Sequence, residues 1–326
     1  MEIKQEFIYN SKILEIHFPV KIDFMISNFL AEVLDKNKVN EIDRLILNLS
    51  GSKFITLPAV VFIICFSGYL KRFKNPYLET RIAVNSDKII SYLVNVGFFT
   101  QMNVYANLIV SYDLLNMEKN IRSKKFKENN ISSNSSILFP ISVIPENIGE
   151  RHFEEYSRSF VYHFNNFFFE LSKNYKFGFS NTSEESQELF GSLYENIKNI
   201  YDHSGTIGFG AIHSSLMQAG TVITFFDFGH GIINTVLDSG KFDSTNRIDA
   251  FYWALENGHS SKKEKGNQGL GFTIIKNFVK KKNGILTIRT DKYLLNFRNG
   301  VNQPLKCFNY FPGTQIVLYV PINIKE

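Results

Sequence analysis

Hydrophobic and polar positions in the first part of the chain follow the periods of strands and helices in turn. Residues 44–49 (Arg-Leu-Ile-Leu-Asn-Leu) alternate regularly, which is typical of a strand with one buried face. Pro58 stands where a helix can begin, because the first turn of a helix needs no hydrogen bond from its backbone nitrogen. The pattern predicts strands at 13–18 and 44–49, a helix at 59–69, a strand at 81–84 and a helix at 88–96. This order predicts a small α/β domain over residues 1–115.

A second pattern begins near residue 137, where helices come early and strands come late. It predicts a strand at 137–144, helices at 151–173 and 183–203, strands at 208–213 and 221–227, a polar loop region to residue 269, a helix at 272–282, and strands at 285–290 and 315–320. We therefore expect an α+β domain over residues 137–326, with helices on one face of a sheet. Residues 116–136 are polar and basic, and we interpret them as a linker. A patch for an anionic surface is the less favoured alternative, because runs of like charge are usually just solvated.

Composition narrows the class of protein. Of 326 residues, 44% are hydrophobic, which excludes a disordered chain, and the net charge of +5 does not by itself indicate nucleic acid. Cys65 and Cys307 are too few for a disulfide framework or a four-cysteine zinc site. We see no secretory signal, and the longest apolar run, 57–70, is shorter than the roughly 18 residues of a spanning helix. These observations favour a cytoplasmic protein without a membrane partner.

The helix predicted at 183–203 carries three polar side chains, Glu195, Asn199 and His203, opposite its apolar residues. They are spaced four residues apart and so form one stripe along the helix. An ordinary surface helix would look the same, and His203 could simply stabilise the helix C-terminus. The chemistry of the stripe also fits a site, because a carboxylate can activate a water, and an amide oxygen can provide one ligand of an octahedral Mg²⁺.

A carboxylate follows the apolar strand predicted at 221–227. The sequence there is Asp227-Phe228-Gly229-His230-Gly231-Ile232. Asp227 could accept a hydrogen bond from an exocyclic amine, while Gly229 and Gly231 leave room for a planar ring. An ordinary Asp/Gly turn is the alternative interpretation. A protein-kinase Asp-Phe-Gly motif is excluded, because the chain has neither a His-Arg-Asp catalytic loop nor a Val-Ala-Ile-Lys strand.

Three glycines, Gly266, Gly269 and Gly271, open the helix predicted at 272–282. Backbone N–H groups at a helix N-terminus, together with the helix dipole, form a site for phosphate oxygens. The order Gly-x-x-Gly-x-Gly differs from the Rossmann fingerprint, and no P-loop Gly-Lys-Ser/Thr occurs in the chain. The polar segment 257–265 ahead of these glycines is interpreted as a lid or, equally well, as a solvated loop.

Taken in order, these motifs resemble the boxes of the GHKL ATP-binding superfamily, which includes DNA gyrase, heat-shock chaperone ATPases, mismatch-repair ATPases, sensor histidine kinases and anti-sigma-factor serine kinases. The resemblance covers residues 184–321 and includes Gly313-Thr314 before the last strand. It is closest to the anti-sigma-factor kinases in its Glu-x₃-Asn-x₃-His spacing and in 269–274 (Gly-Leu-Gly-Phe-Thr-Ile). One departure is Ile200, where the family usually has Ala, and we expect it to narrow the pocket beside the phosphates.

The resemblance implies a Bergerat-fold α/β sandwich that binds ATP and Mg²⁺. Glu195 would orient or deprotonate the attacking nucleophile, Asn199 would ligate Mg²⁺, and His203 would support the site. Asp227 would read the adenine amine. The other cofactor-binding residues that it implies are Gly229 and Gly231 lining the base pocket, Gly269 and Gly271 cradling the phosphates, Thr314 on the adenine side, and Ile232, Gly266 and Leu270 next to these.

The first domain resembles the STAS fold of anti-sigma-factor antagonists. The resemblance rests on residues 44–51, 54–55 and 89–98. Where that family has Asp-Ser-Ser/Thr-Gly, this chain has Thr56-Leu57-Pro58-Ala59. Because Pro58 has no hydroxyl, phosphorylation at that position is excluded. The resemblance therefore implies a docking or dimerising module.

Together, the two resemblances imply an ATP-binding regulatory protein that controls a protein partner, STAS-like or other, through slow hydrolysis or Ser/Thr phosphotransfer. A homodimer is left open. There are three alternative interpretations. A sensor histidine kinase needs an acceptor histidine, but neither His152 nor His163 lies in a His-Glu-x₄-Pro setting. An ATP-gated nucleic-acid clamp is disfavoured, because few residues follow the last strand to form a transducer domain. A module that binds ATP without hydrolysing it cannot be separated from the first interpretation.

Overall fold

The structure is a computed structural model of the 326-residue chain. It describes residues 2–8, 11–36, 39–110, 116, 136–146, 148–174, 183–215, 219–242, 245–256, 271–303 and 305–321. Contacts divide the chain into two units, Met1–Asn134 and Ser135–Glu326. The predicted linker at 116–136 lies outside the described residues except for its two ends.

The sheet of the first unit is mostly parallel. Its strand order is β1-β2-β4-β6-β7, and only β1 runs antiparallel to its neighbour. The strands are β1 (Glu2–Ile8), β2 (Ser11–His17), β4 (Arg44–Asn48), β6 (Glu79–Ala83) and β7 (Leu108–Ile109), with a separate short parallel pair, β3 (Lys21–Ile22) and β5 (Phe54–Ile55). This parallel sheet with its helices confirms the predicted α/β class.

The helices of the first unit are α1 (Ile26–Lys36), η1 (Val39–Glu41), α2 (Leu57–Tyr69), the π-helical turn η2 (Leu70–Lys74), α3 (Asp87–Asn95) and α4 (Phe98–Ala106). Helix α2 contacts both α1 and α4. Its residues are buried from Leu57 to Gly68, as its uniformly apolar sequence requires. Pro58 lies in the first turn of α2 and is itself buried, so the predicted helix start is confirmed.

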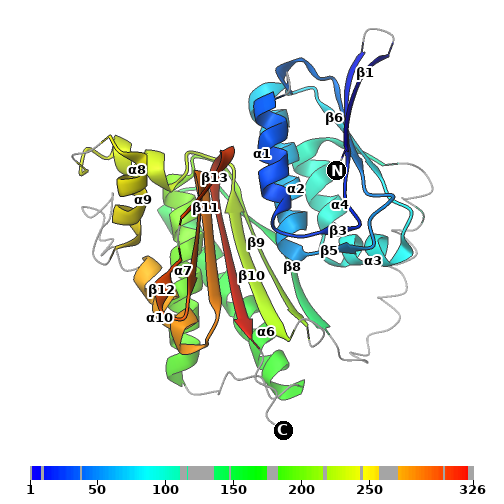
Figure 1. Ribbon diagram of the computed structural model, residues 1–326. Helices are drawn as coiled ribbons and strands as arrows, with labels where there is room; N and C mark the ends of the chain where they lie inside the picture. Colours follow the sequence, from blue (N-terminus) through cyan, green and yellow to red (C-terminus); the bar gives the residue numbers. More distant parts are fainter. Residues whose placement is uncertain are drawn as a thin grey trace. The chain divides into compact units, whose positions relative to one another are not determined.

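The second unit is built on a six-stranded antiparallel sheet (Figure 1). The strand order is β12-β11-β13-β10-β9-β8. The strands are β8 (Ser136–Ile144), β9 (Gly208–Ser215), β10 (Gly220–Asp227), β11 (Ile285–Arg298), β12 (Val301–Asn302) and β13 (Lys306–Pro321). Strands β11 and β13 are the longest described strands of the chain, and they pair with each other past a bulge at Asp291.

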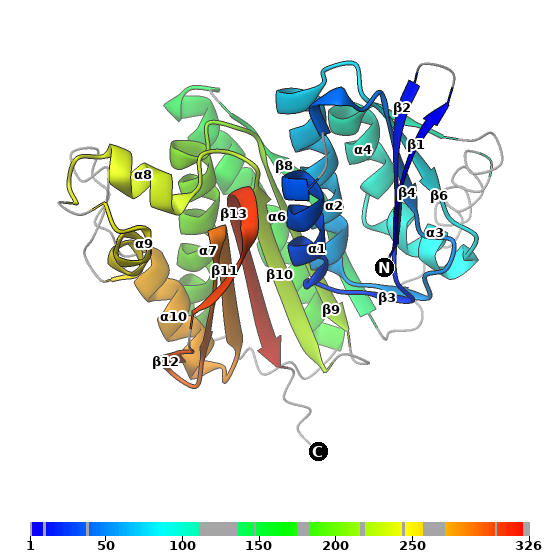
Figure 2. The ribbon, with the colours of Figure 1, turned by 45° about the horizontal axis from the view of Figure 1, so that its top comes forward.

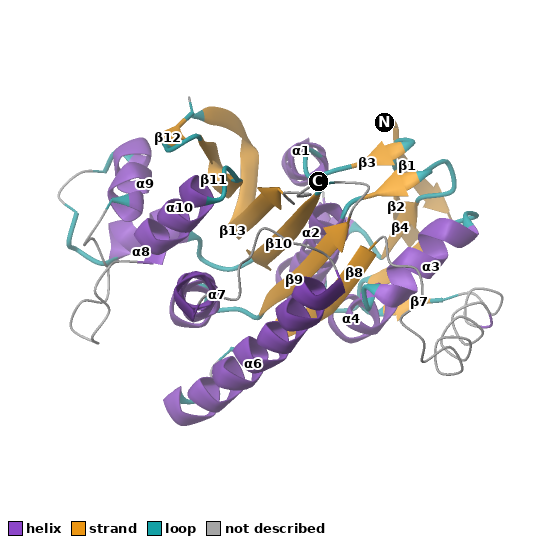
Figure 3. Ribbon diagram, turned by 90° about the horizontal axis from the view of Figure 1, so that it is seen from below, coloured by secondary structure: helices purple, strands orange, loops and turns teal. Residues whose placement is uncertain are grey.

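Helices cover one face of this sheet, as Figure 3 shows for α6, α7 and α10. The helices are α6 (Glu150–Asn174), α7 (Ser183–His203), α8 (Ile232–Asp238), α9 (Arg247–Leu255) and α10 (Gly271–Lys281). Their buried side chains, such as Leu193, Ile197 and Ile275, form one core with strand residues such as Phe225 and Ile316. The predicted α+β class is therefore confirmed for this unit.

One part of the sequence-based interpretation is wrong. Residues 228–269 were expected to be a polar loop region, but they contain α8 and α9. These short helices form because Ile233 and Val236 of α8, and Ala250, Phe251 and Leu255 of α9, enter the core. Figures 1 and 2 place α8, α9 and α10 at the β11 side of the sheet. Within the residue ranges described above, no helix has both the length and the apolar character needed to cross a membrane.

Candidate functional site

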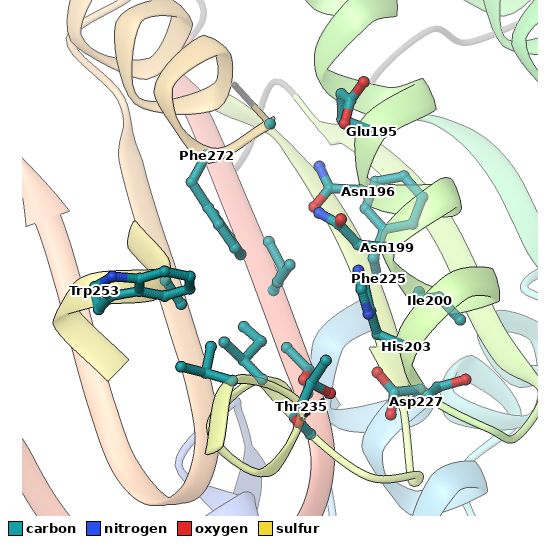
Figure 4. A pocket seen from close by; sticks show the side chains of 18 residues that line it. Glu195, Asn196, Asn199, Ile200, His203, Phe225, Asp227, Thr235, Trp253 and Phe272 are labelled. Atoms are coloured by element: carbon teal, nitrogen blue, oxygen red, sulfur yellow. Dashed lines mark hydrogen bonds between the residues drawn. The ribbon is translucent and has the colours of Figure 1, made fainter. Parts of the chain in front are cut away.

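Helix α7 presents its polar stripe to a pocket. Glu195, Asn199 and His203 all line this pocket, and Figure 4 shows them along one side of it. The opposite side of α7 buries Leu193 and Ile197 in the core, so the rotation of the helix is fixed by its apolar face. The helical spacing in the sequence therefore predicted these three positions correctly as one surface.

The floor of the pocket comes from two paired strands, β10 and β13. Asp227 is the last residue of β10 and is only 3% exposed. Its Oδ1 accepts a hydrogen bond of 2.9 Å from the backbone N–H of Gly229, and the backbone of Thr314 on β13 also bonds to the carboxyl group. Burial raises the pKa of Asp227 to about 7, although these two backbone hydrogen bonds lower it.

The wall across from α7 is formed by α8, α9 and the start of α10. Its aromatic side chains are Trp253 on α9 and Phe272 on α10, which face the α7 stripe across the pocket (Figure 4). The cavity, counted to its open mouth, is about 890 Å³. Its lining combines aromatic and apolar side chains with a few polar ones, which suits a ligand that has both a ring and a polar chain.

The polar end of the pocket lies where α10 begins. Gly271, the first residue of α10, is so close to α7 that a Cβ added to it would lie 3.2 Å from Glu195 Oε2. Burial also raises the pKa of Glu195, while the nearby charge of Lys198 lowers it. The positive end of the α10 dipole thus meets a carboxylate and an amide side chain at one place.

The two glycines after Asp227 have different roles. A Cβ on Gly229 would lie 1.8 Å from the backbone oxygen of Ser204, and His230 N–H donates to that same oxygen at 2.8 Å. Gly229 therefore lets the loop approach the end of α7, and it is not among the residues that line the pocket. Gly231 does line it, with a left-handed φ of +79° that favours glycine.

Most of the site residues predicted from the sequence come together in this one pocket. Those that line it are Glu195, Asn199, His203, Asp227, Gly231, Ile232, Gly271 and Thr314. Gly229 lies behind it, as described above. Gly266, Gly269, Leu270 and the predicted lid at 257–265 lie outside the described residues.

The sequence reasoning assigned no role to several lining residues, namely Asn196, Ser204, Phe225, Thr235, Val236, Trp253, Ala254, Phe272 and Ile316. Trp253 was missed because its segment was interpreted as loop. A helical interpretation of residues 247–255, based on the apolar pair Ala250-Phe251 and Leu255, would have placed Trp253 on a structured wall.

Ile200 also lines the pocket. A Cβ on Gly208 would lie 2.4 Å from Ile200 Cγ2, and Gly208 is the register partner of Asp227. Ile200 is therefore next to the strand residue that pairs with Asp227. Figure 4 likewise draws Ile200 nearer to Asp227 than to Glu195, the residue at the polar end.

No model of a known protein family matches this chain, and a search of curated proteins gives no significant match.

The side chains of the pocket that could bind a metal ion are few. Across the described ranges, no group of three or more His, Cys, Asp or Glu side chains is placed to hold a metal ion. Mg²⁺ commonly binds through one or two protein oxygens together with substrate phosphates and waters. Asn199, with Glu195 one turn before it, fits this shared type of coordination.

Proposed function

We propose that this protein binds Mg-ATP between α7 and the wall formed by α8, α9 and α10, and that nucleotide binding, with slow hydrolysis or Ser/Thr phosphotransfer, controls a protein partner. The observation that carries the proposal is that the pocket has two chemically distinct ends. A buried carboxyl group, Asp227, lies at one end, and Glu195 and Asn199 face the N-terminus of α10 at the other.

The Asp227 end suits an amino-substituted ring. Two backbone hydrogen bonds orient the carboxyl group, and the ionised group can accept another from an exocyclic amine. Apolar contacts for the faces of a ring are available from Ile200, Ile232 and Ile316. Adenine combines these two features, since it has one exocyclic amine and two apolar faces.

The α10 end suits phosphates. Helix α10 spans 11 residues, so its first turn presents several backbone N–H groups without partners in the helix. Because Gly271 carries no side chain, an anion could approach this backbone closely. Asn199 would offer its amide oxygen to Mg²⁺, which would neutralise charge on the phosphates when bound.

Glu195 is placed to move a proton at this end. Its carboxylate lies beside the first residue of α10 and could accept the proton of an attacking hydroxyl. If the attacking group is water, the result is hydrolysis, and if it is a Ser or Thr hydroxyl, the result is phosphotransfer. Burial raises the pKa of Glu195, which makes it a stronger base than an exposed glutamate.

The fold supports the same proposal. The antiparallel sheet with α6, α7 and α10 on one face agrees with a Bergerat fold, and the parallel sheet of the first unit agrees with a STAS-like module.

A titration with Mg-ATP would test the proposal directly. Trp253 is the only tryptophan of the chain and lines the pocket, so its fluorescence should change with saturation. The Glu195→Ala variant should bind ATP but lose hydrolysis. An unchanged fluorescence and an unchanged melting temperature in wild type would refute ATP binding. Acid-labile phosphate that disappears in His152→Ala or His163→Ala would instead support a histidine kinase.

A further inference from the structure

Strand β11 continues beyond the pocket and supports its wall. After the bulge, Tyr293, Leu295 and Phe297 point to the same side of the strand and are buried in the core. The ring of Tyr293 stacks on Phe251 of α9, with centroids 6.5 Å apart. The extension of β11 therefore provides the surface on which α9 packs.

Polar contacts hold both ends of α9. At its start, Arg247 Nε donates to Asp291 Oδ2 at 2.5 Å, and Arg247 Nη2 donates to Asn234 Oδ1 on α8 at 2.7 Å. At its end, Lys276 Nζ of α10 donates to the Leu255 carbonyl at 3.1 Å. Helix α9 is thus connected to β11, α8 and α10 by named side chains.

The bulge of β11 is the point where these contacts converge. Asp291 has a left-handed φ of +56° and a side chain only 8% exposed. Such a backbone conformation is costly for a residue other than glycine and persists only when its surroundings enforce it. Arg247 supplies the countercharge that this nearly buried carboxylate needs.

Thr290, the residue before Asp291, contacts the start of α8 through its hydroxyl group. Thr290 Oγ1 accepts a hydrogen bond of 3.2 Å from the backbone N–H of Ile232, the first residue of α8. The same hydroxyl donates to the Gly313 carbonyl at 3.1 Å. Two consecutive residues of β11 therefore fix the first residue of α8 and the first residue of α9.

We infer that Thr290 and Asp291, the latter through Arg247, are positioning residues that hold the α8–α9 wall, with Trp253, at a set distance from α7. This role concerns the pocket whatever its ligand, and only the identity of the ligand rests on the proposed function. Neither Thr290, Asp291 nor Arg247 lines the pocket, so each acts through the wall.

Two pairs of variants test the inference in the full-length chain. Thr290→Val removes the hydroxyl at nearly constant volume, and Thr290→Ser restores it. Arg247→Gln removes the charge, and Arg247→Lys restores it. Arg158→Gln is the matched control, because Arg158 forms an exposed ion pair with Glu154 on α6 at 3.3 Å, away from the pocket.

Two readouts separate this inference from the proposed function. In the ligand-free protein, acrylamide quenching of Trp253 should increase in Thr290→Val and Arg247→Gln and should return toward wild type in Thr290→Ser and Arg247→Lys. With Mg-ATP, Arg247→Gln should raise the Kd and the KM about tenfold, the loss expected for one charge-assisted hydrogen bond, and Thr290→Val should raise them about fivefold, the loss expected for a neutral one. Their kcat should stay within about twofold, because Glu195 is on the opposite wall.

Failure of the positioning role and failure of the proposed function would give different results. If wild type binds no nucleotide but the quenching pattern is as stated, the proposed function fails and the positioning role stands. If wild type binds Mg-ATP and all variants match it in both quenching and Kd, the positioning role is overturned and the proposed function stands. Quenching that increases equally in Arg158→Gln would also overturn it.

Discussion

Gly271 lies directly against Glu195. A Cβ placed on this first residue of α10 would be 3.2 Å from Glu195 Oε2 and 3.5 Å from Asn199 Nδ2. The distance to Glu195 is shorter than an ordinary contact, so a side chain here would displace that carboxylate by a few tenths of an ångström, whereas the distance to Asn199 is an ordinary contact. The place where phosphates are expected is therefore made of bare backbone on one side and polar side chains on the other.

The Gly271→Ala variant should lose function without losing stability. Gly271 does not have a positive φ, so alanine fits its backbone and should stabilise the helix by about 0.5–1 kcal/mol. The added methyl group displaces the Glu195 carboxylate and covers the backbone that phosphates would approach, so we expect Mg-ATP affinity and turnover to fall about tenfold. Thermal unfolding and a nucleotide titration on the same sample measure both effects.

Gly191→Ala is the matched control for this change. Gly191 lies on α7, where an added Cβ would meet Ile274 at an ordinary contact distance of 3.9 Å. This variant should keep both affinity and turnover. An equal loss of activity in the two variants would show that the Glu195–Gly271 contact is not what matters.

Asp227 should make the ligand-free protein less stable as the pH rises. Its pKa is raised from 3.8 to about 7 in the folded state, so between these values the folded state binds more protons than the unfolded one. Stability therefore falls across this range, by on the order of 4 kcal/mol at most for a shift of this size. Urea unfolding at pH 5 and pH 8 measures the difference, and Asp227→Asn should remove most of it.

Nucleotide binding should show the opposite pH dependence. A carboxylate accepts a hydrogen bond from an exocyclic amine only when it is ionised, so ATP affinity should rise as the pH increases through about 7. Asp227→Asn should bind weakly and without this dependence. Affinity that is constant from pH 6 to pH 8 in wild type would show that Asp227 does not contact the amine.

The sequence predicted one side of the site much better than the other. Glu195, Asn199 and His203 were placed correctly because helical spacing alone puts them on one face. Trp253 was not placed, because the short helix α9 was interpreted as loop and the β11 extension on which it packs was not predicted. That support comes from residues about forty positions later in the chain, which no local pattern reveals.

The role of Gly229 was also predicted wrongly because it depends on a contact between distant segments. The sequence suggested that it lines a base pocket, whereas the structure shows that its backbone passes next to Ser204 at the end of α7. The need for glycine was recognised, but its cause is a contact between segments distant in the sequence. Spacing within a motif cannot distinguish a glycine that makes room for a ligand from one that makes room for the chain.

Gly229→Ala should therefore be a stability variant. The added Cβ would lie 1.8 Å from a backbone oxygen, which cannot move like a side chain, so we expect a loss of about 3 kcal/mol or more. Denaturant unfolding followed by Trp253 emission reports on this unit. Wild-type stability together with weakened nucleotide binding would instead place Gly229 in contact with the ligand.

Ile200 should control the size of the Asp227 end of the pocket. It is 4% exposed, lines the pocket and contacts Gly208, the register partner of Asp227. Ile200→Ala should cost about 2–4 kcal/mol of stability, because it removes buried methyl groups, and Ile200→Val about 1 kcal/mol. The space that it leaves should admit a larger group on the ring amine. The quantity to measure is the Kd for N⁶-benzyl-ATP divided by the Kd for ATP. This ratio should be about tenfold lower in Ile200→Ala than in wild type, with Ile200→Val between them. An analogue enlarged on its terminal phosphate should show no such gain, and a gain there instead would place Ile200 beside the phosphates.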